Sequence, residues 1–144
     1  MKSAELIATV ERWLDVGDAE LALQVDEQLM RVRRCGSGLA FIAPLATAWR
    51  GDEAGLVSAL KLSAASRTRF RAALALDPET RGLCLVQHQR QLDSPALLAV
   101  IEALANQRDV WASMLEAALP RTAAAPRRVV HPFSLGANLC SGIG

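Results

Sequence analysis

Residues 70–118 constrain the fold most, because two apolar runs flank a tight turn and a long periodic segment follows them. Pro78 and Gly82 mark the turn: proline presets the φ of the first corner, and glycine accepts the positive φ that the exit needs. The runs on either side, residues 70–77 and 83–92, therefore predict two strands joined by a reversal of the chain.

A long helix is predicted immediately after this pair of strands. We expect Ser94 to be its N-cap and Pro95 to occupy its first position, where a missing N–H is tolerated. Large side chains then recur at intervals of three and four residues, the spacing of a helix that lies on a sheet. The residues of this stripe are Leu97, Ile101, Leu104, Arg108, Trp111 and Leu115.

The first part of the chain predicts a helix and a three-stranded meander. Residues 3–16 place apolar side chains on one helical face, and Gly17 follows as a left-handed C-cap. Alternating polarity then predicts strands over residues 21–25, 29–35 and 39–45, with short turns between them. One face of such a meander packs on the core, and the other is partly solvated.

A second helix, beginning near Asp52, connects the meander to the strand that starts at Phe70. The predicted order is α-β-β-β-α-β-β-α, an α+β fold with a twisted, mostly antiparallel sheet packed with helices. This domain covers residues 1–119. Residues 120–144 show no period and contain a Gly/Ser-rich end, so we expect a mobile C-terminal tail there.

Composition and chemistry narrow the class of protein. The chain has 144 residues, 51% of them hydrophobic, which favours one folded domain over a disordered chain. No run approaches 18 apolar residues and no signal-peptide core is present, so we expect a cytoplasmic protein without membrane insertion. Cys35, Cys84 and Cys140 match no zinc or redox pattern, and His88 and His131 lack partners at ligand spacing. We therefore predict no enzyme activity, no metal and no cofactor.

Charge is distributed in bands along the chain. Residues 1–30 carry two bases and seven acids, a net charge of −5, whereas residues 31–71 carry eight bases and two acids, a net charge of +6. Such bands suit a protein-binding surface. The basic stretches Arg31–Arg34 and Arg67–Arg71 leave open an alternative, a small nucleic-acid-binding or adaptor domain. Because the chain has only three Trp, three Phe and no Tyr to stack on bases, we expect no nucleic-acid partner.

Several segments, taken in sequence order, resemble the class I type III secretion chaperones, the Tir-chaperone-like proteins of Gram-negative bacteria. The resemblance spans roughly residues 3–118 and rests on pattern and order rather than on a catalytic motif. Its segments are Leu21–Asp26, Phe41–Leu45, Asp77–Gly82, Leu83–Leu85, Leu92–Asp93 and a helix that carries Leu97, Leu104 and Trp111.

This resemblance implies a small cytoplasmic homodimer of a Gram-negative bacterium. Such a protein binds the N-terminal segment of a secreted effector in extended form and keeps it soluble and competent for export, without ATP. It also implies docking to components of the export apparatus. Exposed apolar grooves and unpaired strand edges would provide the binding energy, since a strand edge bonds main chain of any sequence.

Two sets of site residues follow from the resemblance. The first helix and the meander are expected to form the walls of a cargo groove, although each residue could instead close the core of the monomer. This cargo set is Leu6, Val10, Leu14, Leu21, Leu23, Leu29, Val32, Leu39 and Phe41. The dimer set is carried over by position onto the second helix and the strand after it: Leu56, Leu60, Phe70, Ala72 and Leu74. We expect Phe41→Asp to abolish cargo capture but not dimerisation, and Leu74→Arg to give monomers.

Overall fold

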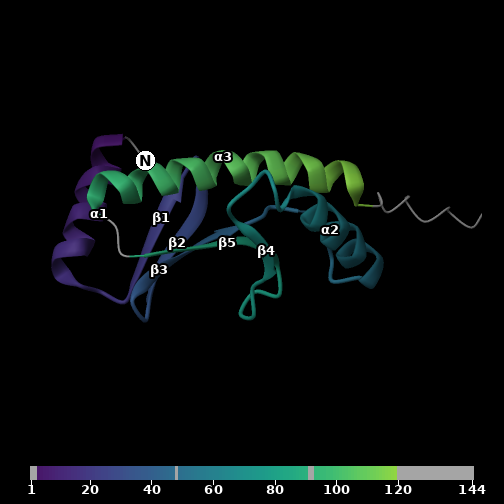
Figure 1. Cartoon of the computed structure of the whole chain (residues 1–144), viewed down its shortest axis with the longest axis horizontal. Coiled ribbons are helices and arrows are strands. Elements are labelled where there is room, and N and C mark those ends of the chain that lie inside the picture. Colours follow the sequence, from purple (N-terminus) through teal and green to yellow (C-terminus); the bar gives the residue numbers. More distant parts are fainter. Residues whose placement is uncertain (1–2, 48, 91–92, 120–144) are drawn as a thin grey trace, which may run out of the picture.

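The computed structural model describes residues 3–47, 49–90 and 93–119, which form a five-stranded antiparallel sheet with helices packed on one face (Figure 1). The helices are α1 (Ser3–Val16), α2 (Glu53–Ser66) and α3 (Ser94–Ala118), and the strands are β1 (Glu20–Val25), β2 (Gln28–Cys35), β3 (Gly38–Pro44), β4 (Ala73–Leu76) and β5 (Leu83–Arg90). The predicted fold class and element order are therefore confirmed. The proposed tail, residues 120–144, lies outside the described residues.

The strand order in the sheet is β1-β2-β3-β5-β4, and every neighbouring pair is antiparallel. Val32 of β2 faces Leu21 of β1 on one side and Phe41 of β3 on the other, and Phe41 in turn faces Gln87 of β5. The last strand in sequence is thus placed inside the sheet. Within the described chain, β1 and β4 are its two edges.

Turn chemistry sets the register of the first two hairpins. Asp26 and Glu27 form the two-residue loop between β1 and β2 with φ values of 53° and 62°, the doubly positive conformation that suits the twist of a tight hairpin. Gly36 has φ 53° in the second loop. Gly38 is needed for space instead, because a Cβ there would collide with the backbone oxygen of Gln89 on β5.

α3 spans the length of the molecule, with α1 packed near its N-terminal end and α2 towards its C-terminal end (Figure 1). The stripe predicted on α3 is buried at all six positions. Trp111 anchors it: its ring lies 6.5 Å from that of Phe70, with 1% of its surface exposed. Gly17 ends α1 at φ 78°, and its N–H donates to the Trp13 carbonyl as a C-cap requires.

Two details of the predicted caps and turns were wrong. Asp93, and not Ser94, is the N-cap of α3, because its carboxylate accepts the Ala96 N–H at 3.0 Å; Pro95 is then the second residue of the helix and not the first. The positive φ of the turn after β4 belongs to Arg81, at 58°, and not to Gly82. The Arg81 N–H donates to the Asp77 carbonyl and the Asp77 N–H donates to the Gly82 carbonyl, so two backbone bonds hold this conformation.

β4 is shorter than the strand predicted over residues 70–77. The carbonyl of Ser66 accepts the N–H groups of Arg69 and Phe70, which extends the end of α2 instead of starting a strand. The main chain of Ala72 then bonds to a side chain: the Gln107 amide accepts the Ala72 N–H at 3.4 Å and donates to its carbonyl at 3.2 Å. Only Ala73–Leu76 remains to pair with β5. No helix of the described residues is long and apolar enough to cross a membrane.

Candidate protein-binding surfaces

β1 offers an unpaired main-chain edge to solvent. The Arg34 N–H donates to the Ala19 carbonyl at 2.8 Å, which fixes the phase of the β1–β2 ladder. Because hydrogen-bonded and non-bonded pairs alternate in an antiparallel ladder, residues 21, 23 and 25 face β2 and the N–H and C=O groups of Glu20, Ala22 and Gln24 point outwards. All three residues are exposed, and β1 has no second neighbour within the described sheet. This edge can accept another strand.

Apolar side chains of α1 lie beside this edge. α1 packs against both β1 and α3, with Val10 and Trp13 buried beneath it. Leu6 and Leu14 are half-buried, and Ile7 is 40% exposed. A strand added to β1 would therefore meet the apolar side of a helix on one face.

The predicted cargo set divides into buried and accessible residues. Leu29 is 44% exposed, and Leu6 and Leu14 keep part of their surface in contact with solvent. The other six belong to the core of the single chain, with at most 8% of their surface exposed: Val10, Leu21, Leu23, Val32, Leu39 and Phe41. These six cannot contact a partner unless the core opens. The cargo assignment itself stays a prediction.

The predicted dimer set gathers at one end of the molecule, where α2 packs near β4. Leu60 is 53% exposed, and its neighbour Val57 is 43% exposed. Leu56 and Leu74 are half-buried against the core. Phe70 contacts Trp111, and Ala72 is buried, so both are tied into the monomer. Leu60 and Val57 are therefore the residues of this end best placed for a second copy.

An apolar groove along α3 was not predicted. It has a volume of about 480 Å³, and α3 provides one wall from Ala99 to Val110, with Phe70 and Gln87 on the other side and Arg69 and Arg71 at the rim. The sequence contains its signal, because Ala99, Ala103, Asn106 and Val110 form a second stripe at helical spacing beside the core stripe. Because most side chains in that stripe are small, they do not fill the space beside α3, and the groove remains.

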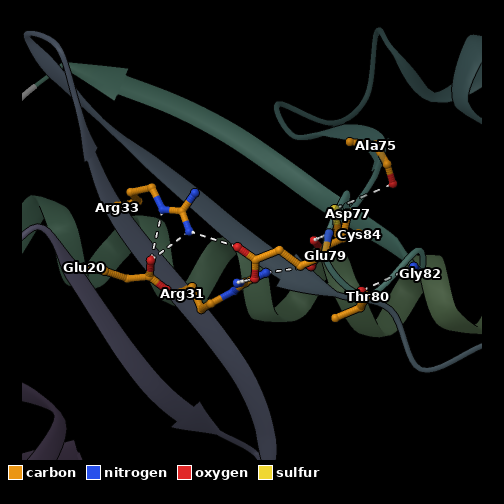
Figure 2. Close-up of polar contacts among 9 residues, drawn as sticks. All are labelled: Glu20, Arg31, Arg33, Ala75, Asp77, Glu79, Thr80, Gly82 and Cys84. Carbon is orange, nitrogen blue, oxygen red and sulfur yellow. Dashed lines mark hydrogen bonds and ion pairs between the residues drawn. The ribbon is translucent and has the colours of Figure 1, made fainter.

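An ion-pair cluster covers part of the face of the sheet opposite to α3 (Figure 2). Arg31 donates to Asp77 at 2.6 Å and to Glu79 at 3.1 Å, and Arg33 donates to Glu20 at 2.9 Å. Asp77 is only 4% exposed. The cluster holds the turn after β4 against β2, although β3 and β5 lie between these strands.

The electrostatic environment of this cluster shifts two pKa values. The backbone N–H of Glu79, which donates to Asp77 at 2.9 Å, lowers the pKa of Asp77 below its ordinary value, and the charge of Arg31 acts in the same direction. Burial raises the pKa of the Cys84 thiol, and the charge of Asp77 adds to the effect. Cys84 therefore stays protonated at neutral pH, and it contacts the Ala75 carbonyl at 3.6 Å.

The structure does not support the single basic patch of the nucleic-acid alternative. Arg31 and Arg33 are paired with carboxylates, and Arg34 lies 4.4 Å over the Trp13 ring while donating to the Asp18 carbonyl. Arg69 and Arg71 line the groove beside α3, on the other face of the sheet. These arginines therefore do not converge on one phosphate-binding surface. His88 is exposed, and the described residues contain no group of three metal-binding side chains.

No family model and no curated protein matches the chain. Solved structures do match. A chain of the ExsC–ExsE complex superposes with a TM-score of 0.59 at 17% identity, covering 81% of this chain and 97% of its own length. A chain of the HopA1–SchA chaperone–effector complex gives 0.56 at 12% identity, covering 78% and 98%.

A third match is a chain of the heterodimeric ExoU–SpcU complex from the type III secretion system of Pseudomonas aeruginosa, with a TM-score of 0.53, 20% identity, and coverage of 78% and 98%. Nearly the whole of each matched chain is therefore covered by this fold. The chain shares its α+β fold with proteins solved in chaperone–effector and type III secretion complexes, in agreement with the resemblance that its sequence carries.

Proposed function

We propose that this protein is a type III secretion chaperone that binds the N-terminal segment of a secreted effector in extended form and keeps it competent for export. The shared fold supports a chaperone role. The observation that carries the binding mode is the free β1 edge, where the main-chain groups of Glu20, Ala22 and Gln24 point to solvent beside the apolar side of α1.

The physical basis of this binding is strand addition. Three outward-facing residues can exchange main-chain hydrogen bonds with an extended segment of about five residues, whatever its sequence. Leu6, Ile7 and Leu14 of α1 would contact alternate side chains of that segment, and burial of apolar area contributes about 25 cal/mol per Å². Binding of this kind requires neither catalysis nor a nucleotide.

We further propose that two copies associate through the end of the molecule formed by α2 and β4. Val57 and Leu60 present apolar surface there that has no contact within the described chain, and Leu56 and Leu74 lie beside it. A two-fold axis through this end would place each of these side chains opposite the same patch of the second copy. The β1 edges would then remain free at the far ends of the dimer.

A proline substitution tests the edge. Ala22→Pro removes an N–H that points away from β2, so the β1–β2 ladder keeps all of its bonds and an edge strand tolerates the change. Ala22→Val leaves the N–H in place and is the matched control. Each variant is co-expressed with the proteins encoded by neighbouring genes, and the purified complexes are examined by light scattering and limited proteolysis.

We expect the unaltered protein and Ala22→Val to form a complex of two chaperone chains with one cargo chain, whose N-terminal segment resists protease. The Ala22→Pro protein should stay folded and leave that segment sensitive. Equal protection by all three proteins would show that cargo binds elsewhere. A monomer that copurifies with nucleic acid in a salt-dependent manner would overturn the chaperone role in favour of the alternative.

A further inference from the structure

The β1 edge has a candidate occupant within the same chain. Residues 120–144 contain prolines at positions 120, 126 and 132, and proline cannot donate to a strand ladder. Between the last two prolines lies Arg127-Arg-Val-Val-His131, a five-residue stretch centred on two β-branched residues. Five residues is also the length needed to pair with Glu20, Ala22 and Gln24.

A hydrogen bond between α3 and the end of β1 brings the start of this segment within reach. Arg108 of α3 is 1% exposed, and its Nη2 atom donates to the Val25 carbonyl at the end of β1 at 3.2 Å. α3 rises about 1.5 Å per residue, so Leu119 lies about 17 Å further along the helix. Residues 120–126, if extended, span about 23 Å. The segment 127–131 can therefore arrive at the Val25 end of β1, which makes it run antiparallel to this strand.

Charge favours the same placement. The turn after Val25 carries Asp26 and Glu27, both exposed, and neither forms an ion pair with another described residue. Residues 120–144 carry three arginines and no acid. A segment that enters at this end brings Arg127 and Arg128 beside the two carboxylates. The next residues, Val129 and Val130, then lie along β1, with one of the two on the α1 side.

We propose that residues 127–131 add to β1 as a sixth, antiparallel strand and occupy the edge until cargo displaces them. The tail is then a built-in competitor that covers main-chain groups otherwise open to any extended chain. Displacement by cargo rests on the proposed function, whereas docking of the tail does not. The two parts are therefore tested separately.

Amide hydrogen exchange of the full chain, without cargo, tests the docking. Val129→Pro combined with Val130→Pro removes the strand's donors in either register, and Ala123→Pro combined with Ala124→Pro adds the same two prolines outside the segment. In the unaltered and control proteins, we expect the exchange rates of the Ala22 and Gln24 amides to be at least about tenfold lower than in the Val129/Val130 variant. In the Val129/Val130 variant, these two amides should exchange at the rate of amides that are fully open to solvent.

Fast exchange at Ala22 and Gln24 in the unaltered protein would overturn the proposal. So would protection that persists in the Val129/Val130 variant and increases with protein concentration, because a second copy would then cover the edge. If docking is confirmed, the same variant should bind co-expressed cargo more tightly than the control protein does. Equal cargo affinity would overturn displacement, and absence of any cargo complex would overturn the proposed function while leaving the docking intact.

Discussion

Arg31 and Asp77 form an ion pair of 2.6 Å between strand β2 and the turn after β4, two places that are 46 residues apart and separated in the sheet by β3 and β5. Arg31 is 13% exposed at its side chain and Asp77 4%. The pair therefore connects two parts of the sheet that are not neighbours, on the face opposite to α3. The exposed pair of Arg33 and Glu20 joins only the neighbouring strands β1 and β2.

Replacing this carboxylate should make stability less dependent on pH. The pKa of Asp77 is lowered in the folded state, so its stabilising effect is complete above the unfolded pKa of about 3.9 and is lost as the pH falls through the lower folded pKa. We expect Asp77→Asn to reduce the free energy of unfolding by about 2 kcal/mol at pH 7, with a smaller difference from the unaltered protein at pH 3. Urea unfolding at the two pH values measures both.

Glu79→Gln is the matched control for Asp77→Asn. Glu79 contacts the same arginine, but it is 65% exposed, so its loss should cost less than about 1 kcal/mol. If the two variants lose the same stability, or if the loss in Asp77→Asn is as large at pH 3 as at pH 7, burial of the Arg31–Asp77 pair is not what stabilises the turn.

The amide of Gln107 should be essential for the path of the chain into β4. It satisfies both main-chain groups of the buried residue Ala72, and a Gln107→Leu variant leaves these groups without partners. We expect a loss of about 2 kcal/mol or more in denaturant unfolding, with faster amide exchange at Ala72. Asn106→Leu alters the neighbouring exposed position and should change stability by less than about 0.5 kcal/mol. Equal effects at the two positions would contradict this role.

Phe41 should contribute to folding in the single chain. None of its surface is exposed, and it lies between Val32 and Gln87 in the middle of the sheet. Phe41→Ala should cost about 3–5 kcal/mol, and Phe41→Asp should prevent folding, contrary to the expectation from the sequence that it would only remove cargo binding. Circular dichroism and urea unfolding provide the measurement, with Ile42→Ala, on the other face of β3, as the milder comparison. A folded Phe41→Asp protein would refute the core assignment.

Association through α2 should be disrupted at Leu60. This side chain is 53% exposed, so Leu60→Arg leaves the core unchanged but places a charge in the proposed interface. We expect the light-scattering mass to fall from two chains to one with an unaltered melting temperature. Leu74→Arg should also give monomers, but Leu74 is half-buried, and a loss of stability would accompany the change. Val16→Arg, on the 63% exposed end of α1, should remain dimeric; a dimeric Leu60→Arg protein would place the interface elsewhere.

Local signals in the sequence were sufficient for the elements and insufficient for their arrangement. Helical spacing and turn residues predicted all eight elements because these depend on neighbours in the chain. The start of β4 was predicted too early, at Phe70, and one reason is that the bond between Gln107 and Ala72 joins residues 35 apart. The insertion of β5 between β3 and β4 likewise depends on contacts that no local pattern encodes.

The candidate binding surface was harder to predict for a chemical reason. An apolar stripe that lines a groove and one that closes a core contain the same residue types, so alternation in β2 and β3 could not separate Leu29, which is exposed, from Phe41, which is buried. The free edge of β1 depends on strand order, and the choice of Glu20, Ala22 and Gln24 depends on the bond between Arg34 and Ala19. Only the structure supplies these two facts.

The interior position of β5 also affects how the chain folds while it is being synthesised. β3 pairs with β5, and the 38 residues from Leu45 to Gly82 are made between them. At a synthesis rate of about 5–20 residues per second, these residues take about 2–8 s to make, and the inner edge of β3 has no partner strand during that time. During each synthesis the sheet therefore has an unpaired inner edge until β5, its last strand to be made, is complete.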